Sequence, residues 1–235
     1  MTAPDSDRVF GFAPGDAFGA EIEARVTAAR IVAVITVDHA PDAVPLARAL
    51  VDGGIGAMEL AWRTADFLPA LRAIKREVPE MLAGAGTLLT PEQVEAVKAA
   101  GADFGVSPGL SRQVVAAARR IGLPYAPGVM TPSDLHSAIE LGCRFLKFFP
   151  AVSSGGLAHL RSIHAPFAHL GLRYLVLGGV SEANAAEYLR EPAVVALGGS
   201  WIAPPALVKQ RAWDVIRDRA AAACALAASC AKNSA

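Results

Sequence analysis

The sequence predicts an α/β fold: a closed (β/α)8 barrel with an extra helix before its first strand. Short apolar runs rich in β-branched residues alternate with amphipathic stretches along almost the whole chain, which indicates parallel strands joined by helices. The alternation gives eight strand–helix units with short connections. The length of 235 residues also fits a barrel of this size.

The expected elements follow one another from the N-terminus. We expect residues 1–13 to form a flexible tail and residues 14–235 to form one barrel domain, which begins with an amphipathic helix over 15–30. The expected strands are 31–37, 55–62, 81–85, 102–106, 124–126, 143–149, 173–177 and 193–197. The helices expected after them are 42–52, 65–78, 91–100, 110–121, 132–141, 156–163, 182–189 and 205–231.

Local signals justify the boundaries of these elements. Residues 31–37 are almost all β-branched or apolar, as in a buried strand. Gly53 and Gly54 end the helix expected over 42–52, and Pro91 suits the first turn of the helix expected over 91–100. Pro150 ends the sixth strand.

The alternative architecture is an open doubly wound sheet. That fold usually has fewer units and a glycine-rich first turn, whereas the first turn here is Val37-Asp38-His39-Ala40. The sequence therefore favours the closed TIM barrel.

Composition excludes several functional classes. Hydrophobic residues make up 53% of the chain and the formal net charge is zero, so we expect a large core and neither a nucleic-acid nor a membrane partner. Residues 1–8 do not resemble a secretory signal, and no apolar run is long enough to cross a membrane. Cys143, Cys224 and Cys230 are widely spaced, which predicts free thiols, a cytoplasmic location and no metal site.

One lysine lies within the sixth predicted strand. By alternation Lys147 shares a face with Cys143, Phe145 and Phe149 near the C-terminal end of that strand. Burial of an ammonium is costly, so an apolar setting favours the free amine, which can form a Schiff base with a ketone. The alternative is a lysine whose head reaches water at the strand end.

A second pair of charges lies at the end of the second strand. Glu59 and Arg63 share a face, while Leu60 and Trp62 face the outer helices. In a barrel the functional site lies at the C-terminal strand ends, so both charges would meet Lys147 there. They can serve as an acid/base carboxylate and a carboxylate-binding arginine, or form a structural ion pair.

Glycines follow several other strands. Gly84 and Gly86 precede Thr87 after the third strand, where the absence of a side chain lets the backbone approach a ligand. Glycine pairs also follow the seventh and eighth strands, at 178–179 and 198–199, and Ser200 comes next. Free backbone N–H groups at such turns predict a phosphate site.

These strand ends resemble the 2-keto-3-deoxy-6-phosphogluconate / 4-hydroxy-2-oxoglutarate aldolases (KDPG/KHG aldolases). The resemblance covers about residues 31–204. It rests on Glu59-(x)₃-Arg63-Thr64, Gly84-Ala85-Gly86-Thr87, Ser107-Pro108-Gly109, Pro127-Gly128, Lys147-Phe148-Phe149-Pro150-Ala151, Gly178-Gly179 and Gly198-Gly199-Ser200-Trp201.

The resemblance implies a role for each matching residue. Lys147 would form the Schiff base and Glu59 would be the general acid/base. The substrate-binding residues it implies, including those that hold the pyruvyl carboxylate and the phosphate, are Arg63, Thr87, Pro108, Phe149, Leu177, Gly178, Gly179, Gly199 and Ser200. It further implies a small, phosphorylated 2-keto-3-deoxy acid as substrate, and a homotrimer with neither metal nor cofactor.

Two positions depart from the family pattern. Many members have a threonine before the seventh-strand glycine pair, where this chain has Leu177, and some have an arginine after strand one, where this chain has 36–38. We therefore expect a class I aldolase that cleaves the phosphogluconate-derived substrate, 4-hydroxy-2-oxoglutarate or both. The alternatives are an aldolase for the galactonate epimer, a non-catalytic metabolite-binding barrel, and a phosphate-binding isomerase or synthase.

Overall fold

The strands form one parallel sheet with the order β5-β4-β3-β2-β1-β9-β8-β7-β6. The structure is a computed structural model, and it describes residues 17–232. Its strands are β1 (Ile31–Ile35), β2 (Ala57–Ala61), β3 (Leu82–Gly86), β4 (Phe104–Val106), β5 (Tyr125–Ala126), β6 (Gly128–Val129), β7 (Phe145–Phe148), β8 (Arg173–Val176) and β9 (Val194–Gly199). The predicted tail over 1–13 and the first residues of the helix predicted at 15–30 lie outside the described residues.

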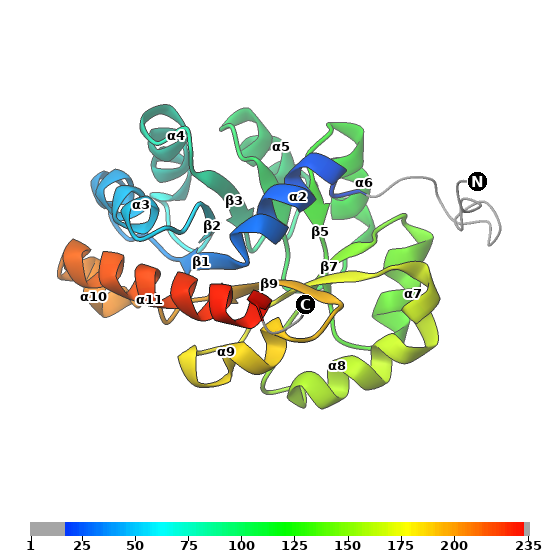
Figure 1. The fold of residues 1–235 in the computed structure, drawn as a ribbon. Helices are drawn as coiled ribbons and strands as arrows, with labels where there is room; N and C mark the ends of the chain where they lie inside the picture. The colour runs from blue at the N-terminus through cyan, green and yellow to red at the C-terminus, as the bar shows by residue number, and fades with distance from the viewer. Residues whose placement is uncertain (1–16, 233–235) are drawn as a thin grey trace.

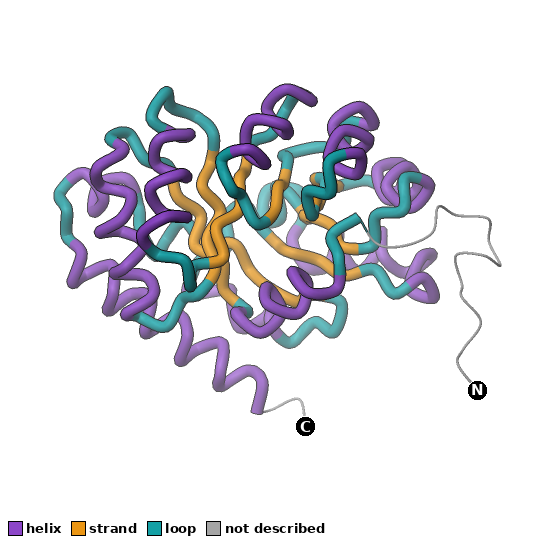
Figure 2. The backbone as a smooth tube through the Cα atoms, turned by 90° about the horizontal axis from the view of Figure 1, so that it is seen from above, coloured by secondary structure: helices purple, strands orange, loops and turns teal. Residues whose placement is uncertain are grey.

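The sheet closes at Pro127, and here the prediction of a single fifth strand is wrong. Ala126 of β5 pairs with β4, whereas Gly128 of β6 pairs with Lys147 of β7. Pro127 between them has no N–H to donate, so the ladder is interrupted and the chain passes from one neighbour to the other. The two ends of the sheet are thus consecutive in the chain, and the predicted closed barrel is confirmed (Figure 2).

Helices surround the ring of strands on its outside, except α2, which lies across the N-terminal end of the ring (Figure 1). They are α2 (Ala20–Ala29), α3 (Ala43–Asp52), α4 (Phe67–Glu77), α5 (Pro91–Ala99), α6 (Arg112–Arg120), α7 (Pro132–Glu140), α8 (Gly156–His164), α9 (Glu182–Leu189), α10 (Pro205–Lys209) and α11 (Trp213–Lys232), with short 3-10 turns at Ala40–Asp42 and Ala165–Leu170. Among these described helices, none is both long and apolar enough to cross a membrane.

The helix predicted over 205–231 is two helices. Arg211 has a φ of 52°, a left-handed conformation that ends α10 before α11 begins. The guanidinium of Arg211 lies 2.8 Å from the Asp42 carboxylate near the start of α3. Residues 210–212 contain neither glycine nor proline, so local sequence signals did not reveal this turn.

Apolar side chains pack in two shells. The outer shell lies between strands and helices and includes Leu60, as predicted, with Trp62 packed against it. The inner shell fills the barrel and includes Phe145 and Leu175. Cys143 was predicted to share the face of Phe145, but it precedes β7, where strict alternation does not hold, and packs in the outer shell.

The segment leading into α2 closes the N-terminal end of the barrel. The Phe18 ring stacks on Phe145, with centroids 4.1 Å apart, and also contacts Phe104 at 5.7 Å. Phe104 and Phe145 are the first residues of β4 and β7, so Phe18 blocks the lumen at the starts of these strands. The polar residues described next lie toward the opposite end.

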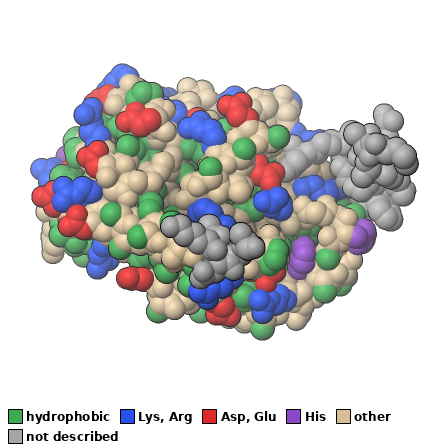
Figure 3. Space-filling view, in the orientation of Figure 1, with side chains coloured by type: hydrophobic (Ala, Val, Ile, Leu, Met, Phe, Trp, Pro, Cys, Tyr) green, Lys and Arg blue, Asp and Glu red, His purple; other side chains and the backbone are tan. Residues whose placement is uncertain are grey.

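On the face drawn in Figure 3, the charged side chains of the described residues are of mixed sign. Lysines and arginines alternate with acidic side chains over the face in Figure 3, consistent with a formal net charge of zero.

Candidate active site

Lys147 and Glu59 meet inside the barrel. The Lys147 Nζ lies 2.8 Å from Glu59 Oε1 and 3.0 Å from Oε2. Their strands, β7 and β2, lie on opposite sides of the ring, and both side chains are more than 90% buried. The sequence predicted that these charges converge, with a structural pair between Glu59 and Arg63 as one alternative. In the structure Glu59 pairs with Lys147 instead.

This pairing alters the expected environment of the lysine. The prediction took an apolar setting as the cause of a free amine, whereas the structure gives the ammonium a carboxylate partner. The amine becomes nucleophilic only when a proton leaves Nζ, and Glu59 is a base within hydrogen-bond distance. The Phe149 ring lies on another side of the lysine, with its centroid 5.4 Å from Nζ.

Gly86 makes room for the Glu59 carboxylate. A Cβ at Gly86 would lie 2.1 Å from Glu59 Oε1, which is far inside van der Waals contact. A Cβ at Gly84 would likewise lie 2.2 Å from the Phe104 ring. The sequence predicted that these glycines let the backbone approach a ligand, but their neighbours here are side chains of the barrel interior.

The pair lies in a cavity of about 150 Å³. Its lining residues are Val34, Glu59, Arg63, Thr87, Pro108, Lys147, Phe149, Leu177, Gly178, Gly179, Val180, Gly198 and Ser200. The structure thus brings together every predicted site residue except Gly199. Val34, Val180 and Gly198 were not predicted.

Strand alternation explains why Gly198 lines the cavity and the predicted Gly199 does not. A Cβ at Gly198 would meet the Leu177 side chain at 2.3 Å, so this glycine faces the lumen. A Cβ at Gly199 would meet the Trp201 ring at 2.1 Å, outside the barrel. Alternation from the inward Ala196, had it been applied to β9, would have selected Gly198. The same rule places Val34 inward with Val32.

Arg63 and Thr87 form one side of the cavity. The Arg63 guanidinium makes no hydrogen bond or ion pair with any residue of 17–232, and this side chain is exposed at the cavity mouth. Thr87 has a φ of 63°, a left-handed conformation that is unfavourable for a β-branched residue. Strained backbone of this kind concentrates at functional sites, because it fixes a side chain where relaxed backbone would not place it.

The turn after β8 forms the opposite side. Gly178 and Gly179 have φ values of 94° and 79°, conformations that L side chains rarely adopt. A Cβ at Gly178 would come within 2.9 Å of Pro150, so the turn packs closely on the loop after β7. Within the described residues, no bond from the amides of 178–180 is recorded, and these amides are free to bind an anion before α9.

Leu177 makes the adjacent wall apolar. It is 3% exposed and belongs to the inner shell with Leu175, as strand parity predicts. Its side chain lies over Gly198, close to Val34. This part of the cavity therefore offers no side-chain hydrogen bond to a substrate hydroxyl.

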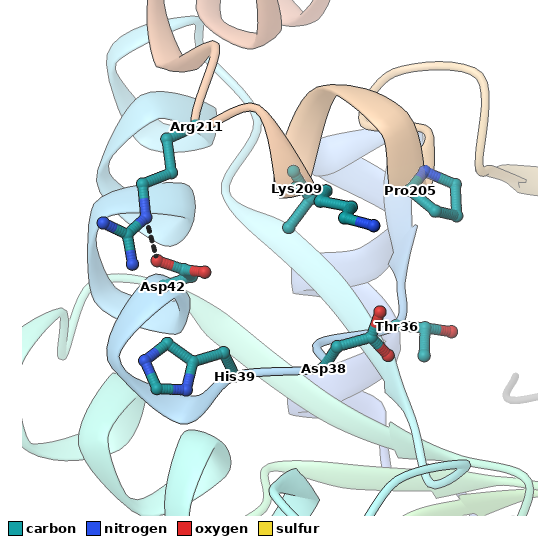
Figure 4. A pocket seen from close by; sticks show the side chains of 8 residues that line it. Thr36, Asp38, His39, Asp42, Pro205, Lys209 and Arg211 are labelled. Atoms are coloured by element: carbon teal, nitrogen blue, oxygen red, sulfur yellow. Dashed lines mark ion pairs between the residues drawn. The ribbon is translucent and has the colours of Figure 1, made fainter.

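A larger cavity, of about 550 Å³, lies between the end of β1 and α10 (Figure 4). Lys209 lies on one side of it and Asp38 on the other, while Arg211 and Asp42 form an ion pair at its edge. It lacks the buried amine–carboxylate pair, so the smaller cavity is the candidate active site. Among the described residues, no cluster of His, Cys, Asp and Glu suits a metal ion.

Comparisons with known proteins agree with this assignment. The family model of the KDPG and KHG aldolases matches residues 22–219. The 2-dehydro-3-deoxy-phosphogluconate aldolase of Treponema pallidum is 43% identical over 175 residues, which are 74% of this chain and 82% of that protein. The KHG/KDPG aldolase of Escherichia coli K12 is 40% identical over 194 residues, 83% of this chain and 90% of that protein.

A solved structure gives the same result. It is the KDPG aldolase of Legionella pneumophila with pyruvate captured as a covalent carbinolamine intermediate. Its sequence is 37% identical, its TM-score is 0.81, and the match covers 85% of this chain and 97% of that one.

Proposed function

Because the chain belongs to the KDPG and KHG aldolase family, we propose that it is a class I aldolase that uses Lys147 to form a Schiff base. Its substrates are 2-keto-3-deoxy-6-phosphogluconate, 4-hydroxy-2-oxoglutarate or both. The products are pyruvate and either glyceraldehyde 3-phosphate or glyoxylate. The observation that carries the proposal is the buried contact of 2.8 Å between Lys147 and Glu59.

The first half of the reaction makes the covalent intermediate. Glu59 accepts a proton from the Lys147 ammonium, and the free Nζ attacks the ketone carbon C2 to give a carbinolamine. Loss of water, with Glu59 returning a proton to the departing oxygen, leaves an iminium ion. A carboxylate 2.8 Å from Nζ is placed for both transfers.

The second half breaks the carbon–carbon bond. Glu59, acting through a water molecule, removes the proton of the C4 hydroxyl, and the C3–C4 electron pair moves into the iminium. The aldehyde leaves, and an enamine of pyruvate stays on Lys147. Protonation at C3 and hydrolysis of the iminium release pyruvate and restore the lysine.

Different walls of the cavity bind different parts of the substrate. Arg63 and Thr87 hold the pyruvyl carboxylate, for which a guanidinium that lies at the mouth and pairs with no described residue is suited. Phe149 and Pro108 pack on the pyruvyl carbons. Three further residues, Gly178, Gly179 and Ser200, bind the terminal phosphate through backbone amides and a hydroxyl.

The apolar wall determines substrate preference. Leu177 offers no hydrogen bond, so a hydroxyl buried against it loses its water partners without replacement. We propose that the enzyme prefers 4-hydroxy-2-oxoglutarate, which has fewer hydroxyl groups, or cleaves sugar-acid epimers with little discrimination. The test is pyruvate release from a panel of 2-keto-3-deoxy acids, each assayed with and without phosphate; no release from any of them would refute the aldolase.

The proposal extends to assembly and location. We expect a homotrimer that needs no metal or cofactor, as the family resemblance implies, and a cytoplasmic location, as the free cysteines predict. Sedimentation gives the oligomeric state, and full activity after treatment with a chelator tests the independence from metal.

A further inference from the structure

The segment 200–203, between β9 and α10, carries Ser200 into the cavity and has few internal bonds. Among the described residues, no hydrogen bond of the Ser200 hydroxyl is recorded, and neither is a bond from the amides of 200–203. One bond reaches this segment from elsewhere. Nη1 of Arg219, on α11, donates to the backbone carbonyl of Trp201 at 2.7 Å.

The Trp201 side chain is held from the other direction. A Cβ at Gly199 would lie 2.1 Å from the Trp201 ring, so the indole packs directly on the β9 backbone. The ring also packs against the outer shell. Trp201 is therefore fixed by its ring and by its carbonyl, and Ser200 is the single residue between it and Gly199.

Arg219 also borders the start of α9. It lines a cavity of about 360 Å³ together with Ser181, Glu182 and Trp201. Ser181 follows directly on the turn that contains Gly178 and Gly179. One arginine thus lies behind both turns that present groups to the candidate phosphate site, while no part of it lines the active-site cavity.

We propose that Arg219 is a positioning residue for the terminal phosphate of the substrate. Its bond to the Trp201 carbonyl holds segment 200–203 against β9 and so directs the Ser200 hydroxyl toward the phosphate. This inference rests on the proposed function. It assigns a role in substrate binding to α11, a helix that contributes no residue to the cavity lining.

The test compares substrates with and without phosphate. Arg219→Ala should raise KM for 2-keto-3-deoxy-6-phosphogluconate about three- to tenfold, the usual effect of one hydrogen bond, with kcat changed less than twofold. KM for 4-hydroxy-2-oxoglutarate should stay the same. Arg219→Lys, which retains a donor, should recover part of the loss.

Two controls separate positioning from a general structural effect. Arg217→Ala removes an arginine on the same helix whose ion pairs, with Asp214 and Asp218, stay within α11, and it should change neither KM. Arg219→Ala in a Ser200→Ala background should add little to the effect of Ser200→Ala, because both act through one hydroxyl.

Several outcomes would overturn the inference. They are an unchanged KM in Arg219→Ala, an equal rise for both substrates, and full additivity with Ser200→Ala. If the wild-type protein releases pyruvate from neither substrate, the aldolase proposal fails first. Calorimetry with inorganic phosphate then tests the role of Arg219 separately. If Arg219 positions the phosphate site, Arg219→Ala binds phosphate more weakly than the wild type, and equal binding would refute that role.

Discussion

Lys147 and Glu59 form a buried ion pair across the barrel, with Nζ 2.8 Å and 3.0 Å from the two carboxylate oxygens. The residues are 88 positions apart in the chain, and the closed ring of strands brings them together. Each side chain compensates the charge of the other inside an otherwise apolar shell. Removal of one partner is therefore expected to affect both stability and chemistry.

The first prediction concerns the nucleophile. Borohydride reduction in the presence of pyruvate should add a stable mass to the peptide that contains Lys147, because reduction traps the iminium. Lys147→Arg should abolish the label, since a guanidinium stays protonated and cannot form an imine. Peptide mass spectrometry locates the adduct, and a label on Lys98 or Lys209 instead would refute the assignment.

The second prediction separates the acid/base from the nucleophile. Glu59→Gln should still accept the pyruvate label, more slowly, but its kcat should fall roughly a hundred- to ten-thousandfold. The amide also leaves the ammonium charge uncompensated, so stability should fall by about 3–5 kcal/mol. Steady-state kinetics and denaturant unfolding measure the two effects. Wild-type turnover in this variant would contradict the role of Glu59.

The third prediction tests the space beside Glu59. Gly86→Ala places a Cβ 2.1 Å from Oε1, so the carboxylate must shift from its position beside Lys147. A displacement of about 1 Å typically costs a hundredfold in rate, and we expect a loss of kcat of that order. Gly56→Ala is the matched control, because a Cβ there meets no atom within 4 Å. Equal activity of the two variants would show that Glu59 does not depend on this space.

The fourth prediction concerns Leu177. Leu177→Thr should raise kcat/KM for the gluconate-derived substrate relative to 4-hydroxy-2-oxoglutarate by about tenfold, since the new hydroxyl can pair with a substrate hydroxyl. Competition assays with both substrates give this ratio directly. A wild-type enzyme already selective for the gluconate-derived acid, with no gain on substitution, would reduce Leu177 to a packing residue.

Much of the fold was predictable because parallel strands and their helices have distinct periods. Because the apolar Leu60 and Trp62 alternate with Glu59 along the strand, the sequence alone predicts that the Glu59 carboxylate points into the barrel. The division of the fifth strand at Pro127 was not predicted. It depends on the pairing of residues 125–126 with β4 and of residues 128–129 with β7, which the local sequence does not contain. The turn at Arg211 was missed for a related reason: it is stabilised by tertiary contacts, which a local helix pattern does not contain.

The site was predictable as a set of strand ends, but its internal contacts were not. The sequence indicated that Lys147, Glu59 and Arg63 converge, yet several pairings satisfied that pattern. The role of Gly86 depends on the position of a side chain on the neighbouring strand. Gly199 was implied by the family resemblance, whereas strand alternation from Ala196 selects Gly198, the member of the pair that faces the lumen.

Phe18 stacked on Phe145 fills the lumen at the N-terminal end of the barrel, opposite the cavity that contains Lys147. We therefore expect the substrate to enter, and both products to leave, at the C-terminal ends of the strands. On the proposed mechanism the pyruvyl group stays covalently attached to Lys147 after the C3–C4 bond breaks, so the aldehyde departs first and pyruvate follows after hydrolysis. The same mechanism reverses the order in the synthetic direction: pyruvate has to bind first, because its enamine on Lys147 is the nucleophile that attacks the aldehyde.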